Sequence, residues 1–476
     1  MRIFRFFRFL SLVIFLIFDY VSVSMAEEIS HSLQALGNIL PFWTAFPFLL
    51  LLLSIAILPL VIPHWWEHNR NRAVITASIA IPFAAYLILV HGQIGLYELI
   101  HALKDYASFI ALLGALFAIS GGIYIKGSLS GTPLSNTVFM RIGAVLANFI
   151  GTTGASMILI RPMLRANEMR LRKVHIVVFF IFIVSNCGGL LTPLGDPPLF
   201  LGFLKGVPFE WTLRLWKEWL LVNGLLLIFF NFFDQYTLSK EEKERQGSQL
   251  EMIMEHQPLR IEGWHNLFFL LGIVFVILAK GYGWGMSGND WPFGLQEGLM
   301  LGLTLAAYLT TRTSTRHANR FTFSPIIEVA ILFAGIFVTM IAPILILNVQ
   351  GDELGISKAW HFFWATGLLS SFLDNAPTYL NFAATACGKF GVSVEGSKYL
   401  AEFLMKGPEA VALLTAISCG AVFMGANTYI GNGPNFMVKA IAEENGIKMP
   451  SFFGYMIYSG LILIPTFILV TMIFFL

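Results

Sequence analysis

Two acidic residues stand inside apolar sequence, next to residues that break helices. Asp196 lies in TPLGDPPLF (192–200), between a glycine and two prolines, and Asp374 lies in FLDNAPTY (372–379). A carboxylate at membrane depth is costly unless it is paired, protonated or bound to a cation. We therefore predict that both acids couple the movement of protons or cations. The alternative is that each one caps the start of a half-helix.

Hydroxyl and carboxamide side chains accompany the two acids at these interruptions. Their oxygens are hard ligands, of the kind that sodium and similar cations prefer. We expect Asp196 and Asp374 to be sodium ligands and the neighbouring polar residues to bind the substrate or ion. These residues are Asn148, Thr152, Thr153, Ser185, Asn186, Thr192, Asn375, Thr378, Asn427, Thr428, Asn432 and Asn435.

Other kinds of chemistry find little support. The sequence has no P-loop, zinc motif, haem signature or Ser/His/Asp order, so we expect no enzyme, no catalytic residue and no cofactor, with sodium and protons as transported species. The three cysteines are scattered and are expected to be small buried side chains. Glu328 stands within an apolar segment, where it could relay protons or hydrogen-bond to another helix. No lysine or arginine stands at the interruptions.

The elements that must position these residues are membrane helices. Of the 476 residues, 57% are hydrophobic and 12% are charged, whereas soluble domains carry about 25% charged residues. Many windows exceed the ~18 apolar residues that a spanning helix needs. The net charge of +2 does not by itself indicate a partner, since binding of nucleic acid would need a concentrated basic patch. We expect an all-α polytopic membrane protein whose partners are the lipid bilayer and small ions.

The first 26 residues have the features of a signal peptide. Arg2, Arg5 and Arg8 precede an apolar run at 9–18, which is followed by SVSMA. A basic start, a short apolar core and a small-residue ending are typical of a cleaved signal. The alternative is an uncleaved additional helix.

Hydropathy predicts about ten transmembrane helices and two interrupted segments, at 141–160 and 359–387. A polar stretch at 237–264, read as a cytoplasmic linker, divides the chain near its middle. The spans are expected at 41–62, 73–91, 107–126, 175–204, 213–233, 265–282, 293–311, 324–347, 409–440 and 451–475.

The two halves, 27–236 and 265–476, are weakly similar to each other. FIGTTGAS (149–156) and TPLGDPPLF in the first half correspond to FLDNAPTY and TYIGNGPNF (428–436) in the second. Each half thus has a predicted hairpin followed by a broken helix, at about 175–204 and 409–440. Matched interruptions of this kind indicate a duplicated architecture.

Loop charge predicts how the halves insert. The loop RPMLRANEMRLRK (161–173) holds five Lys/Arg, which places it in the cytoplasm. It would lie outside if 141–160 crossed the membrane, so we predict a re-entrant hairpin there that opens to the cytoplasm. The same count makes 359–387 a hairpin that opens outward. The halves are therefore inverted repeats.

Irregular backbone at membrane depth persists only when it is buried in protein or lines a wet cavity. Matched breaks in inverted halves are typical of the central site of a secondary transporter. The alternative is that glycine and proline merely kink ordinary helices. An ion channel or a non-transporting scaffold is a further alternative, although a channel would typically repeat one pore motif across subunits.

The motifs resemble the ion transporter superfamily, which includes NhaD-type sodium/proton antiporters, arsenite permeases, and citrate and dicarboxylate transporters. SNCGGLLTPLGDPP (185–198) is similar to the NhaD-type break, and FLDNAPTY to its second hairpin tip. The resemblance implies an elevator-type carrier, a homodimer in a bacterial-type inner (plasma) membrane. It implies Asp196 and Asp374 as coupling acids, with Asn186, Asn375 and Thr378 as neighbours.

This sequence departs from the NhaD pattern in two places. The first tip reads Gly151-Thr152-Thr153, without an aspartate–asparagine pair, and the second break has Asn432 where the first has Asp196. We predict sodium/proton antiport. The alternative is sodium- or proton-coupled transport of citrate, another carboxylate or an arsenite-type oxyanion, which would need a basic or donor-rich pocket.

Overall fold

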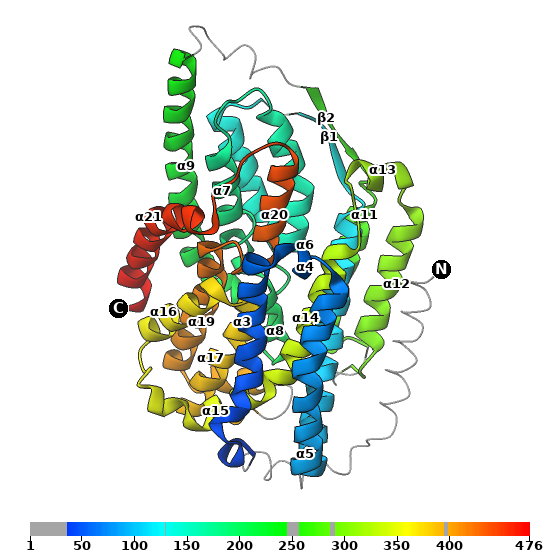
Figure 1. Cartoon of the computed structure of the whole chain (residues 1–476), viewed down its shortest axis with the longest axis vertical. Coiled ribbons are helices and arrows are strands. Elements are labelled where there is room, and N and C mark those ends of the chain that lie inside the picture. Colours follow the sequence, from blue (N-terminus) through cyan, green and yellow to red (C-terminus); the bar gives the residue numbers. More distant parts are fainter. Residues whose placement is uncertain (1–35, 129, 245–256, 286–290, 395–397) are drawn as a thin grey trace.

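The structure is a computed structural model that describes residues 36–128, 130–244, 257–285, 291–394 and 398–476. The predicted signal peptide at 1–26 lies outside the described residues. Within them, six helices are long and apolar enough to cross a membrane, or up to seven if α14 and α15, bent by 41° at their junction, form one span. This confirms the predicted all-α polytopic membrane fold (Figure 1).

The helices of the first half cover most of the predicted segments, but the predicted spans 73–91 and 107–126 lie in one helical segment that ends at Ser120, and residues 124–126 are in a strand. These helices are α3 (Phe46–Val61), α4 (Pro63–Trp66), α5 (Asn69–Ser120), α6 (Pro133–Ala166), α7 (Val174–Ile183), α8 (Pro197–Leu204) and α9 (Trp216–Glu244). The second half holds α11 (Asn266–Gly281), α12 (Leu295–Thr310), α13 (Thr313–Ala318), α14 (Ser324–Thr339), α15 (Ile341–Gln350), α16 (Ala359–Phe372), α17 (Asn375–Lys389), α18 (Tyr399–Met405), α19 (Pro408–Met424), α20 (Gly433–Glu444) and α21 (Phe452–Val470). A short antiparallel ribbon pairs β1 (Tyr124–Ser128) with β2 (Gln257–Glu262).

Two of the long helical segments reverse direction at a glycine. Gly92 in α5 has φ 56° and Gly151 in α6 has φ 77°, a left-handed conformation that costs glycine little because it lacks a Cβ. Asn136 and Asn167, near the two ends of α6, exchange side-chain hydrogen bonds of 2.9 and 2.8 Å. The two arms of α6 therefore lie side by side, and Gly151 forms the tip of a helical hairpin inside the predicted 141–160.

The broken helices are interrupted where the glycines and prolines stand. After α7 comes a short 3-10 helix (Cys187–Leu191), followed by extended Thr192, a turn at 193–195 and extended Asp196, before α8 begins with Pro197 and Pro198. After α19, a 3-10 helix (Gly425–Asn427) is followed by α20, which has Pro434 in its first turn. Proline suits a helix start because the first N–H groups have no partner within the helix.

Equivalent hydrogen bonds join each hairpin to the broken helix of its own half. The Thr192 hydroxyl donates to the Asn148 carbonyl, and the Thr428 hydroxyl donates to the Ser371 carbonyl. These pairs occupy aligned positions in the sequence motifs of the two halves. The halves thus fold alike at these points, while the side of the membrane to which each hairpin opens stays a prediction.

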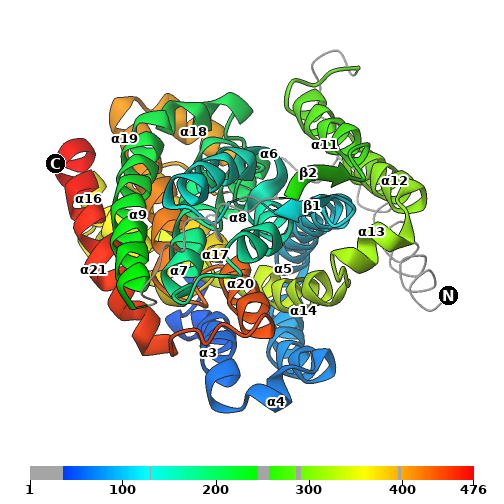
Figure 2. The ribbon, with the colours of Figure 1, turned by 90° about the horizontal axis from the view of Figure 1, so that it is seen from above.

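The helix α9 continues beyond the predicted end of its span at 233, into the predicted linker. Asp234 and Glu241 are fully buried in this extension, where both contact Arg170 of the loop before α7. These buried ion pairs hold the extension against the protein, so the first turns of the linker region are helical. Seen from above, α8 and α17 lie near the centre of the molecule, with α9 and α21 to one side and α11 and α12 to the other (Figure 2).

Candidate functional site

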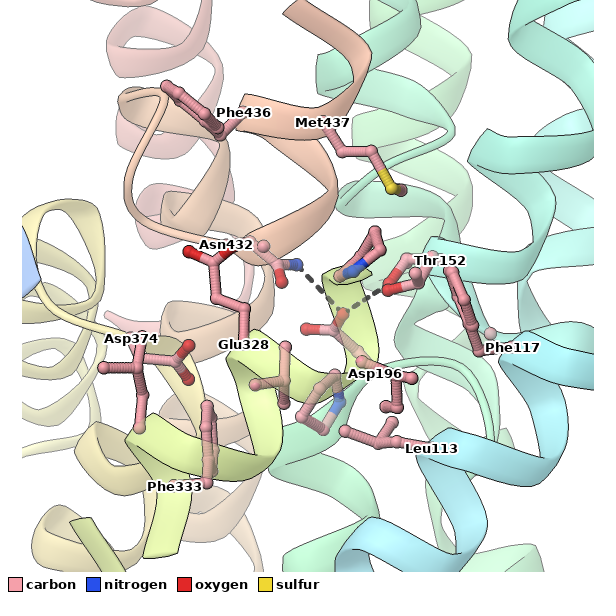
Figure 3. A pocket seen from close by; sticks show the side chains of 18 of the residues that line it. Leu113, Phe117, Thr152, Asp196, Glu328, Phe333, Asp374, Asn432, Phe436 and Met437 are labelled. Atoms are coloured by element: carbon pink, nitrogen blue, oxygen red, sulfur yellow. Dashed lines mark hydrogen bonds between the residues drawn. The ribbon is translucent and has the colours of Figure 1, made fainter. Parts of the chain in front are cut away.

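The carboxylate of Asp196 is the point at which three other interruptions meet. Its Oδ1 accepts hydrogen bonds from the Thr152 hydroxyl (2.8 Å) and from Asn432 Nδ2 (3.0 Å), and its Oδ2 accepts one from Asn375 Nδ2 (2.5 Å). Thr152 follows the α6 tip, Asn375 begins α17, and Asn432 precedes α20. Figure 3 shows Thr152 and Asn432 reaching Asp196. A carboxylate that is 1% exposed is thus held by neutral donors from both halves.

The backbone turns this carboxylate toward its partners and away from its own helix. Asp196 immediately precedes α8 in an extended conformation (φ −146°, ψ 146°), and its side chain makes no capping hydrogen bond. Asn432 precedes α20 with nearly the same angles (φ −154°, ψ 141°) and likewise makes no side-chain cap. Extended residues at both breaks leave their side chains free to meet between the halves.

Asp374 is placed differently from Asp196. Its Oδ1 accepts a hydrogen bond from the Ala376 N–H (3.1 Å), so it caps the start of α17. The Thr378 hydroxyl donates to the backbone carbonyl of Asp374 (2.9 Å). The capping alternative therefore describes the contact of Asp374 and not that of Asp196, although a capping carboxylate retains oxygens that can face a ligand.

A pocket of about 400 Å³ lies beside Asp196 and also reaches Asp374. This volume falls within the range of about 300–1,000 Å³ that is common for small-molecule sites. Thr152, Thr153 and Asn432 contribute polar groups to its wall. Much of the remaining wall is apolar and comes from α5, α14 and α20, including Leu113, Phe117, Phe333, Phe436 and Met437 (Figure 3).

The pocket wall also contains an ion pair that the sequence did not predict. Arg72 NH2 lies 3.0 Å from Glu328 Oε1, and both residues line the pocket together with Glu67. The predicted second span begins at residue 73 and leaves Arg72 out, whereas α5 begins at Asn69 and holds Arg72 in its first turn. Of the two roles considered for Glu328, the structure shows the contact with a neighbouring helix.

Most of the other predicted site residues support the interrupted backbone, where buried polar groups need partners. Asn148 Oδ1 accepts from the Leu191 N–H (2.7 Å), and Asn186 Nδ2 donates to Asn435 Oδ1 across the two halves (2.6 Å). Ser185 bonds to Ser156 (2.8 Å), Asn427 bonds to Ser371 (2.9 Å), and Thr192 and Thr428 bond as described above. None of these seven predicted site residues lines the pocket.

Sodium coordination by Asp196 and Asp374 stays a prediction. Within the described stretches, no group of three or more His, Cys, Asp or Glu side chains could hold a metal ion. An oxygen donor is nonetheless present: Asn375 Oδ1 is buried without a hydrogen-bond partner, on a side chain whose Nδ2 contacts Asp196. A sodium ion bound there would be cargo or a coupling ion.

Comparison with protein families gives the class of the protein. A family described as "Putative citrate transport" matches residues 37–475. The chain belongs to this family. No curated protein matches it. It is therefore a multi-pass membrane transporter, and the match includes both halves and every interruption that surrounds Asp196.

Proposed function

We propose that this citrate-family transporter carries a small carboxylate coupled to sodium ions or protons. The observation that carries the proposal is the pocket of about 400 Å³ beside Asp196, with Arg72 in its wall. A bare cation needs only a tight shell of oxygen ligands, whereas this space suits an organic acid. Arg72 supplies the basic group that a carboxylate cargo requires.

The charge of the pocket explains why such a cargo needs accompanying cations. Four acids line it, Glu67, Asp196, Glu328 and Asp374, against the one guanidinium of Arg72, a formal balance of −3 (+1 − 4). A site with this balance repels a free anion. Sodium ions or protons that neutralise the acids remove the repulsion, so cargo and cations enter together.

The arrangement also suits an elevator-type mechanism. The donors to Asp196 come from both hairpins and from the second broken helix, so these segments move as one body if their hydrogen bonds persist. The cargo would then cross between inward- and outward-facing positions within that body. A homodimer in a bacterial-type inner membrane would provide the stationary scaffold.

Sodium/proton exchange is the second candidate, and the excess of acids around the pocket favours it. An exchanger requires a carboxylate that binds sodium and protons in turn, and Asp196 is the buried acid with neutral partners. Exchange does not require the volume of the pocket or its arginine.

Reconstituted vesicles that enclose a pH dye test both candidates. We expect labelled citrate to accumulate when an inward sodium or proton gradient is applied, with arsenite measured in parallel. Proton movement driven by sodium, without uptake of any carboxylate, would replace the proposal with exchange.

A further inference from the structure

The pocket wall formed by α5 and α14 carries its own recognition element, separate from the interruptions. Arg72 is 7% exposed and is fixed from several directions. Its NH2 contacts Glu328 (3.0 Å), its NH1 donates to Asn69 Oδ1 (2.8 Å), and its guanidinium carbon lies 5.9 Å from the ring centroid of Trp66. The guanidinium is therefore held in one orientation at the pocket.

One donor of this fixed guanidinium is unused. Arg72 Nε is buried and has no hydrogen-bond partner. A buried N–H without an acceptor is costly, and arginine offers its donors in a planar fork that matches both oxygens of a carboxylate. An anionic group that replaced Glu328 at the NH2 edge of the guanidinium could also accept from Nε, and would thereby satisfy the unused donor.

The partner of Arg72 can be displaced. The side chain of Glu328 is 36% exposed, against 8% for that of Arg72, so the glutamate has more room to move while the arginine stays in place. We propose that Arg72 binds one carboxylate group of the cargo in exchange for Glu328, and thereby selects dicarboxylates and tricarboxylates. The proposal rests on the function proposed above.

Selection follows from the need for two contacts. A dicarboxylate or tricarboxylate can place one group on Arg72 and another near the cations held by Asp196 and Asp374. A monocarboxylate can make only one of these two contacts. Arg72 therefore makes binding depend on the number of carboxylate groups in the cargo, while Asp196 and Asp374 couple uptake of the cargo to the cations.

The test measures sodium-dependent uptake of labelled citrate by the full chain in vesicles, with unlabelled acetate, succinate and citrate as competitors. For Arg72→Gln we expect the citrate concentration at half-maximal uptake to rise at least about tenfold, and the preference for citrate over acetate to collapse. For Glu328→Gln we expect tighter citrate binding, because the internal competitor is removed. Arg320→Gln is the matched control, since Arg320 pairs with Glu444 (3.5 Å) at an exposed position.

Wild-type half-saturation and competition in Arg72→Gln would overturn the proposal. If size-exclusion chromatography shows that Arg72→Gln does not fold, the Arg72→Lys and Glu328→Gln variants test the proposal instead. The lysine keeps the charge but loses the fork, so weaker citrate binding is expected, and unchanged values in both variants would overturn the proposal. A wild-type protein that takes up no carboxylate defeats the proposed function itself, and this inference with it, before any variant is compared.

Discussion

At the scale of single residues, the contacts of Asp196 separate coupling from support. Its carboxylate is buried and satisfied by three neutral donors, so its charge has no fixed counter-ion. Arg72, in contrast, has a carboxylate partner in Glu328. A buried charge without a counter-ion gains most from a transported cation. Coupling is therefore expected to reside in Asp196, and recognition of the cargo in Arg72.

Removing the charge of Asp196 should abolish coupling. In Asp196→Asn, one carboxylate oxygen becomes an NH2 that faces donors, so we expect sodium-driven citrate uptake to fall at least about tenfold. Labelled uptake in vesicles measures it. Asp105→Asn is the control, because Asp105 pairs with Lys205 and does not line the pocket. Normal uptake by the Asp196 variant would remove this residue from the mechanism.

Adding a charge opposite Asp196 should change the cation requirement. Asn432 donates to Asp196 over 3.0 Å, so Asn432→Asp would bring two carboxylates together, a pair that needs a shared proton or an additional cation. We expect citrate uptake to depend more steeply on the sodium concentration, because an additional cation must bind. A sodium titration of uptake measures it, and an unchanged sodium dependence would show that position 432 lies outside the coupling site.

At the scale of elements, the hairpin formed by α6 depends on its tip and on its open end. Gly151 provides the reversal with φ 77°. At the other end, Asn136 and Arg170 contact Asp234 of α9 (3.0 and 2.7 Å). The tip places Thr152 against Asp196, and the buried charges anchor the hairpin to α9. Both features should be sensitive to substitution.

A side chain at the tip should strain the reversal. We expect Gly151→Ala to destabilise the protein by about 1–2 kcal/mol, because a left-handed conformation is unfavourable for alanine. The thermal unfolding midpoint in detergent measures the change. Gly224→Ala in α9 is the control: nothing lies within 4 Å of the position of its Cβ, and no positive φ is involved. Equal midpoints for the two variants would contradict this account of the tip.

Two arginines of one loop should differ sharply in their contribution to stability. Arg170 and its partners Asp234 and Glu241 have 0% side-chain exposure, whereas Arg172 and Glu244 are 39% and 45% exposed. Arg170→Met removes the guanidinium from two buried carboxylates, leaving Asp234 with His175 and Asn136 and Glu241 with backbone N–H donors, and should cost about 3–5 kcal/mol. Arg172→Ala should cost less than about 1 kcal/mol. Denaturation in detergent compares them, and similar losses would refute the anchoring role of the buried pair.

At the scale of the whole molecule, the inverted insertion of the two halves is the central expectation. The native cysteines, Cys187, Cys387 and Cys419, are all buried, so a cysteine introduced into a loop becomes the accessible thiol. A membrane-impermeant maleimide should label Glu353→Cys from outside intact cells and should not label Glu168→Cys. Labelling of both, or of neither, from outside would refute the inverted arrangement. The opposite pattern would reverse the orientation of the whole chain.

The sequence by itself determined where the helices break and which polar residues lie at the breaks. Glycine and proline act on their own backbone, and a charge in an apolar run is visible without any knowledge of its surroundings. For this reason Asp196, Thr152 and Asn432 could be selected from the sequence. The similarity of the halves then predicted that the breaks would meet.

Only the tertiary structure decided which side chains from other helices lie opposite the breaks. Arg72 contacts Glu328 because α5 packs beside α14. No local sequence pattern predicts a contact between residues so far apart in the chain. Likewise, Asp374 caps its own helix while Asp196 turns across to the other half. The local backbone conformation depends on neighbouring residues in the sequence, whereas the partner of a buried charge depends on how whole helices pack.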